Sequence, residues 1–105
     1  MTYDHLFQTL GDPTRRAIYE RLIVGGEQTV RVLTDHAGIS QPAVSKHLAM
    51  LKSAGLVNDR RDGRQTHYTA DPDGLKPLRG WIDHYSAYWE ARFDKLENLL
   101  DRMDQ

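Results

Sequence analysis

The tetrapeptide Ala37-Gly38-Ile39-Ser40 separates two short amphipathic segments, and it constrains the fold more than any other feature of the chain. Gly38 allows the left-handed conformation that ends a helix, and Ser40 is a preferred cap at the start of the next helix. Ile39 is apolar and can anchor the turn in a core. We therefore predict a helix-turn-helix over residues 29–54.

Two more short helices are predicted before this motif. One covers residues 2–10, where Leu6 and Phe7 belong to an apolar stripe. The other begins at Asp12-Pro13, an acidic cap followed by a proline in the first turn, and it stops before Gly25-Gly26. Its apolar face is expected to contain Ala17, Ile18, Leu22 and Ile23.

A β-hairpin is predicted after the helix-turn-helix. Residues 56–61 and 64–69 have the composition of strands, and Asp62-Gly63 between them is typical of a type I′ turn. We define this wing as residues 56–69. Arg60, Arg61 and Arg64 lie on or beside its turn, next to Gln65.

Charge is distributed unevenly along the chain, although the net charge is only −1. Residues 39–70 carry five basic and two acidic residues, whereas residues 71–105 carry five and eight. Nucleic-acid affinity follows the local patch rather than the sum. On the second helix of the motif, Gln41 can pair with adenine, Ser45 can donate or accept, and Lys46 can contact phosphate or guanine. His47 offers a further base or phosphate contact.

These features together favour a protein that binds double-stranded DNA. A polar helix face or a charged hairpin alone is typical of a solvated surface. Here the order of the two elements, their spacing and their shared positive charge favour DNA binding. The arginines would then contact the DNA backbone or the minor groove. The alternative is a winged-helix protein-interaction module without specific DNA binding. The chain shows no glycine-rich phosphate loop, nucleophile motif or paired carboxylates, so we do not expect an enzyme.

Four sequence blocks resemble the ArsR-type winged-helix repressors. They are LGDPTRRAI at 10–18, ISQPAVSKHL at 39–48, LKSAGLV at 51–57 and RDGRQTHY at 61–68. The resemblance implies a mainly α fold with a small β-hairpin, and a cytoplasmic homodimer that represses transcription from an operator until a signal arrives. The family's recognition and wing positions correspond to Gln41, Ala43, Ser45, Lys46, His47, Arg61, Gly63 and Arg64.

A long final helix is predicted after the turn Asp71-Pro72-Asp73-Gly74, with apolar residues recurring every seven positions from Leu75 to Met103. We expect residues 1–105 to form a single domain. A domain this small cannot cover so long an apolar face, so we expect residues 1–11 and 74–105 to form a helical dimer interface. The residues expected there are Leu6, Phe7, Ile82, Tyr85, Trp89, Leu96 and Leu99. Alternatively, Trp81, Tyr85, Tyr88 and Trp89 line a pocket for an unknown small-molecule effector.

No metal ion or other cofactor is expected, which places the chain with the metal-independent subset of these repressors. The chain contains no cysteine, so thiolate metal sites are ruled out. Asp83 and His84 lie side by side, but no second histidine follows to complete a tetrahedral set. No apolar run is long enough to cross a bilayer and no signal peptide is evident, so we expect a cytoplasmic protein without a membrane partner.

Overall fold

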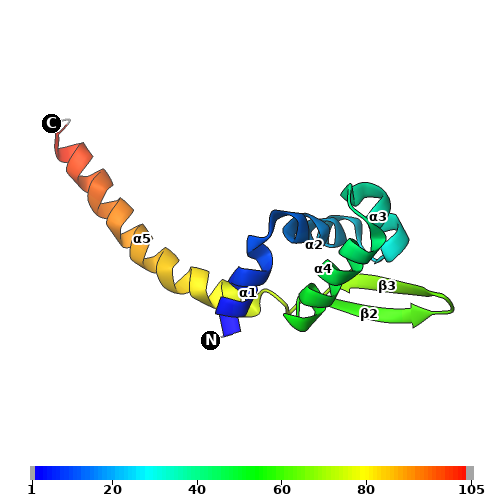
Figure 1. Ribbon diagram of the computed structural model, residues 1–105. Coiled ribbons are helices and arrows are strands. Elements are labelled where there is room, and N and C mark those ends of the chain that lie inside the picture. The colour runs from blue at the N-terminus through cyan, green and yellow to red at the C-terminus, as the bar shows by residue number, and fades with distance from the viewer. Residues whose placement is uncertain (1, 104–105) are drawn as a thin grey trace. The chain divides into compact units, whose positions relative to one another are not determined.

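The computed structural model describes residues 2–103, whose elements are drawn in Figure 1. The helices are α1 (Thr2–Gly11), α2 (Pro13–Gly25), α3 (Val30–Ala37), α4 (Gln41–Ser53) and α5 (Lys76–Met103). The strands are β1 (Gln28–Thr29), β2 (Val57–Asp62) and β3 (Gln65–Ala70). The chain divides after Leu75 into two compact units, so α5 is described by itself. The predicted class, mainly α with a small β-hairpin, is confirmed.

The helix boundaries follow from caps that the sequence supplies. The Asp12 carboxylate accepts a hydrogen bond from the backbone N–H of Arg15 at the start of α2 (3.1 Å), and Ser40 Oγ accepts one from that of Ala43 at the start of α4 (3.3 Å). Gly38 ends α3 in the left-handed conformation, with φ 70° and ψ 13°. The predicted turn between α3 and α4 is therefore confirmed.

The hairpin turn lies one residue later than predicted. Asp62 pairs with Gln65 in the sheet register, so the two loop residues are Gly63 and Arg64 rather than Asp62 and Gly63. Gly63 has φ 63°, and no non-glycine residue of the described chain has positive φ. A glycine at the first loop position followed by negative φ is the type II′ pattern, so the type I′ prediction is wrong.

A third strand was not predicted. Gln28 and Thr29 form β1, which pairs antiparallel with β3, and the sheet order is β1-β3-β2. A two-residue strand has no periodicity to detect, and Thr29 also caps α3 by accepting from the N–H of Val32. The pairing attaches the base of the wing to the start of the helix-turn-helix.

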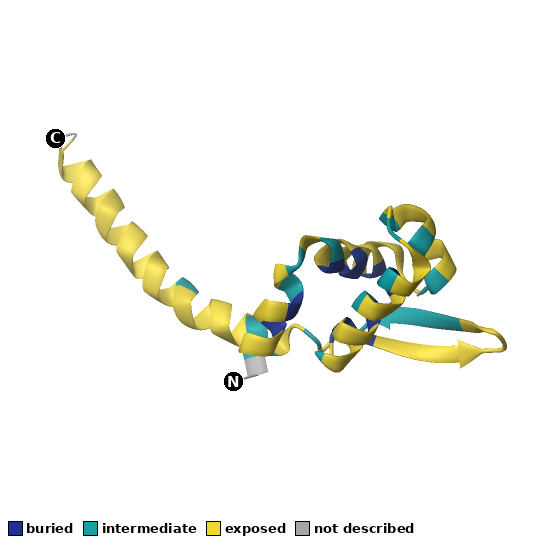
Figure 2. Cartoon of the chain, in the orientation of Figure 1, coloured by how far each residue is buried: buried dark blue, intermediate teal, exposed yellow. Residues whose placement is uncertain are grey.

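The core of the first unit lies between α1, α2, α3, α4 and the beginning of β2, where Figure 2 shows buried positions. On α2 the prediction was partly wrong, because Ala17 and Ile23 are exposed while Arg15 and Tyr19 are buried. The buried face is rotated because a charged residue belongs to it. The buried apolar residues are Leu6, Ile18, Tyr19, Leu22, Leu33, Val44, Leu48, Leu51, Leu56 and Val57.

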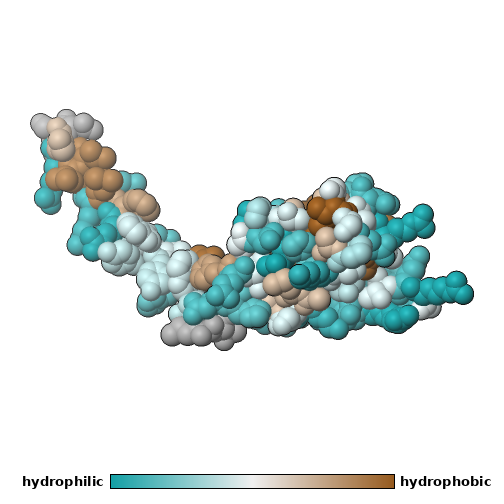
Figure 3. Space-filling model, in the orientation of Figure 1, coloured by the Kyte–Doolittle hydropathy of each residue, from teal (hydrophilic) through white to brown (hydrophobic). Residues whose placement is uncertain are grey.

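The second unit is a single helix, α5, of 28 residues, which corresponds to about 42 Å at 1.5 Å per residue. None of its described residues is buried. Large apolar and aromatic side chains, among them Trp89 and Leu99, remain exposed along it. Figure 3 shows hydrophobic residues, in brown, on the surface of this helix. Across residues 2–103, no helix is long and apolar enough to span a membrane.

Candidate nucleic-acid interface

Helix α4 directs three of its apolar residues inward and leaves a polar face at its N-terminal half, whereas Met50 in its last turn is exposed. Val44, Leu48 and Leu51 recur at i, i+4 and i+7 and have no exposed surface. On the remaining surface, Gln41, Ser45 and Lys46 are exposed. The N-terminal half of α4 therefore offers an amide, a hydroxyl and an ammonium group, which can hydrogen-bond base edges and phosphates.

Two of the residues expected on this face are less available. Ala43 is half-buried, and so is His47, whose Nδ1 is buried and has no hydrogen-bond partner among the described residues. His47 lies near Asp12, since the backbone N–H of Arg15 and, more weakly, the charge of His47 lower the pKa of the Asp12 carboxyl. Burial of its Nδ1 leaves His47 less available to DNA than Gln41, Ser45 or Lys46.

A groove joins the recognition helix to the wing. It has a volume of about 380 Å³ and brings Gln41 and Ser45 of α4 together with Arg64 of the hairpin turn. The other residues that line it are Thr29, Val30, Arg31, Gln65, Thr66 and Tyr68. Of these residues, Arg31 is a cation in the first turn of the helix-turn-helix. The sequence analysis did not select it for DNA binding, although its position in that turn was a usable signal.

The three arginines of the wing differ in their partners. Arg60 donates from Nε and Nη2 to the two carboxylate oxygens of Glu27, at 2.9 and 2.6 Å, and this bidentate pair lowers the pKa of Glu27. Arg61 Nε donates weakly to the carbonyl oxygen of Gly63 (3.4 Å). Within residues 2–103, no carboxylate pairs with Arg61 or Arg64. These two arginines are therefore available for phosphate.

Lys52, at the last turn of α4, is also already paired. Its Nζ lies 2.9 Å from an Asp59 oxygen of β2, and the hydrogen bond to this carboxylate raises the pKa of the ammonium group. Among the described cations of α3, α4 and the wing, Arg31 and Arg64 line the groove. Lys46 of α4 and Arg61 of β2 are exposed but do not line it.

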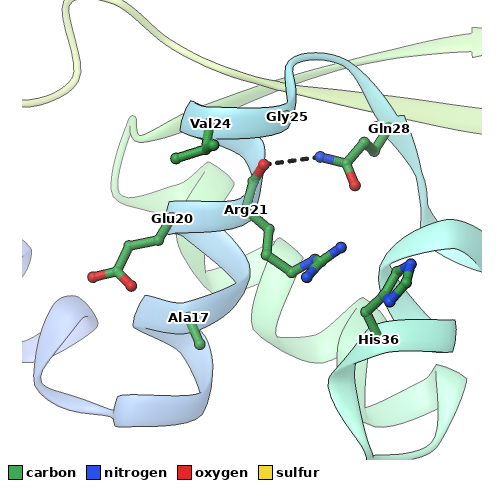
Figure 4. Close-up of a pocket in the computed structure, with 7 residues that line it drawn as sticks. All are labelled: Ala17, Glu20, Arg21, Val24, Gly25, Gln28 and His36. Atoms are coloured by element: carbon green, nitrogen blue, oxygen red, sulfur yellow. Dashed lines mark hydrogen bonds between the residues drawn. The ribbon is translucent and has the colours of Figure 1, made fainter.

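A second hollow of about 710 Å³ lies on a different surface, between α2 and the end of α3 (Figure 4). It shares no lining residue with the groove above. Gln28 Nε2 donates to the carbonyl oxygen of Arg21 (2.9 Å), and the side chains of Arg21 and His36 lie on the same side of the hollow, with Glu20 on the other. Both signs of charge are present, so the hollow has no single electrostatic preference.

The residues expected at a dimer interface are mostly exposed in the single chain. Phe7 of α1 and Ile82, Tyr85, Trp89, Leu96 and Leu99 of α5 all keep between 41 and 54% of their surface. Leu6 keeps only 2%, so it is a core residue and is left out of the proposed interface. In the part of the chain that the structure describes, no three His, Asp or Glu side chains gather as a metal site would require.

Comparison with known proteins gives consistent results. Residues 10–60 match a family model described as a helix-turn-helix domain. The chain is 42% identical over 98 residues to the HTH-type transcriptional regulator Rv2034 of Mycobacterium tuberculosis, covering 93% of this chain and 88% of that protein. It is 34% identical over 79 residues to the transcriptional repressor SdpR of Bacillus subtilis, covering 75% and 87%.

Solved structures agree with the fold. A crystal structure described as an ArsR family transcriptional regulator superposes with a TM-score of 0.76 at 28% identity, over 85% of this chain and 91% of that one. An ArsR-like transcriptional regulator from Rhodococcus sp. RHA1 superposes with a TM-score of 0.73 at 26% identity, over 93% and 92%.

Proposed function

Since the chain belongs to the ArsR-type family of winged helix-turn-helix, DNA-binding transcriptional regulators, we propose that it represses transcription as a homodimer bound to an inverted repeat. The observation that carries this proposal is the groove in which Gln41, Ser45 and Arg64 meet. It combines groups that read bases with a cation for the backbone.

The proposed contacts divide by element. Gln41 and Ser45 read base edges in the major groove, while Lys46 holds a phosphate. Arg61 and Arg64 at the wing contact the backbone or a narrow minor groove. Gly63 allows the tight turn that carries Arg64, whereas Ala43 and His47 support α4 from its half-buried side.

The proposed dimer uses the exposed apolar stripe of α5. A stripe of four helical heptads that is unburied in its own chain is typical of a helix that packs against a second copy. A two-fold dimer supplies two α4 helices, whose half-sites lie about one turn of DNA apart, roughly 34–36 Å. This geometry is the reason for expecting an inverted repeat.

The test is selection of bound fragments from genomic DNA by the purified protein at two salt concentrations. We expect an inverted repeat that is still retained at the higher salt. Sequence-independent binding that disappears with salt, or no binding, would favour the alternative of a winged-helix protein-interaction module.

A further inference from the structure

The wing is attached to the body by ion pairs on both of its faces. In the sheet register His67 of β3 pairs with Thr29 of β1 and with Arg60 of β2, so these three side chains share one face. Glu27 precedes β1 and reaches along that face to Arg60, and its Oε1 also lies 3.7 Å from Nδ1 of His67. The Glu27 carboxylate thus connects the segment before β1 to β2, so it links the two edge strands of the sheet.

The opposite face carries a second pair. Asp59 precedes Arg60 in β2, so its side chain is directed to the other side of the sheet. There its carboxylate meets the ammonium group of Lys52 at 2.9 Å, at the end of α4. Consecutive residues of β2 are therefore held from opposite sides, one by the segment before β1 and the other by the recognition helix.

We propose that these two ion pairs brace the wing, and that Glu27 is a positioning residue that orients Arg61 and Arg64 toward DNA. The inference rests on the proposed function, since it assigns the wing arginines to DNA. Beyond its first residue, every residue of β2 is exposed, so apolar packing fixes little of this outer strand of the hairpin. A wing ordered before binding loses less conformational entropy when it meets DNA.

The competing interpretation is that Arg60 itself contacts phosphate, and that Glu27 only competes with the phosphate for the Arg60 guanidinium group. The two interpretations predict opposite signs for one substitution. If Glu27 competes with DNA, then Glu27→Gln removes a repulsive charge and tightens binding. If Glu27 positions the wing, then Glu27→Gln weakens binding although the protein has become more positive.

The experiment measures affinity of the full chain for its selected DNA at several salt concentrations. We expect Glu27→Gln to weaken binding about two- to five-fold, the scale of an exposed ion pair, with an unchanged salt slope. Arg60→Gln should behave alike, and the double variant should be about as weak as the weaker single variant, because the shortest contacts of both residues are the two bonds that join them. Glu20→Gln, an equal charge change at an exposed position on α2, is the control, and it should bind no more weakly than the wild type.

Three further measurements separate positioning from simple loss of structure. The charge-exchanged variant Glu27→Arg with Arg60→Glu should recover affinity, and thermal unfolding should be unchanged in all variants. Amide hydrogen exchange at residues 61–66, without DNA, should accelerate in Glu27→Gln. Tighter or equal binding by Glu27→Gln, or additive effects with Arg60→Gln, would overturn the inference. A wild-type chain that binds no DNA would overturn the proposed function instead, while the exchange rates would still decide whether the brace exists.

Discussion

The guanidinium group of Arg15, on α2, donates a hydrogen bond to the carbonyl oxygen of Thr9 at the end of α1, at 3.1 Å. Arg16 does the same for the carbonyl oxygen of Leu10, at 2.8 Å. The last carbonyl groups of a helix have no partner within it and carry partial negative charge, so two cations from the next helix are well placed there. The arginine pair thus fixes the corner between α1 and α2.

Arg15→Ala is expected to destabilise the fold. Its side chain is 10% exposed, so truncation leaves the Thr9 carbonyl without its charged donor in a buried site. We expect a loss of about 2–3 kcal/mol in the free energy of unfolding, measured with urea. Arg16→Ala is the control, because Arg16 is exposed and water can replace it. Equal losses for the two variants would contradict the role of burial.

Acid should weaken the same corner through Asp12. The backbone N–H of Arg15 lowers the pKa of its carboxyl below the ordinary value of 3.8. A carboxylate whose pKa is lowered by folding stabilises the protein fully above its unfolded value, and this contribution disappears as the pH falls through the folded value. The stability difference between the wild type and Asp12→Asn should therefore be constant above about pH 5 and shrink below 3.8. A difference that stays constant from neutral pH down to pH 2 would contradict this contribution of the Asp12 charge.

Local signals predicted the helices of the first unit well, because caps and glycines act within a few residues. Ser40 and Gly38 define the turn of the motif, and their geometry needs no distant partner. The sequence does not predict features that depend on contacts between distant residues. The strand at Gln28 and the bond from Arg60 to Glu27 join residues that are far apart in the chain. The burial of Arg15 follows no periodic pattern.

The candidate site shows the same division. Gln41, Ser45 and Arg64 were selected from residue type and position, and the structure places them around one groove. His47 was selected in the same way, but it is half-buried and its Nδ1 is covered by other parts of the fold. No local pattern reveals which of the three adjacent polar residues at 45–47 is directed inward.

Substitution of Gln41 or Ser45 by alanine should change which sequence is preferred. If either side chain reads a base, its loss costs about 1–3 kcal/mol on the selected DNA and little on random DNA. Competition binding with both DNAs measures the ratio. A uniform loss on both would indicate a backbone contact and would contradict direct readout by that residue.

Arg64→Ala should weaken binding to all DNA and reduce the salt slope by about one, as expected when one phosphate contact is lost. Arg21→Ala is the matched control, since Arg21 is an exposed arginine on α2 that does not line the groove. Binding isotherms at four salt concentrations give both slopes. An unchanged slope for Arg64→Ala would remove the wing tip from the DNA interface.

Trp89→Asp should convert the proposed dimer to monomers. Trp89 is 53% exposed in the single chain and lies within 6.2 Å of Phe93 between ring centroids, on the apolar stripe of α5. A carboxylate there would be buried without a partner in a two-fold interface, which costs several kcal/mol for each copy. Ala91→Asp places the same charge on the polar face of α5 and should leave the dimer intact. Sedimentation equilibrium of both variants decides the matter, because a stable Trp89→Asp dimer would show that the subunits associate through a different surface.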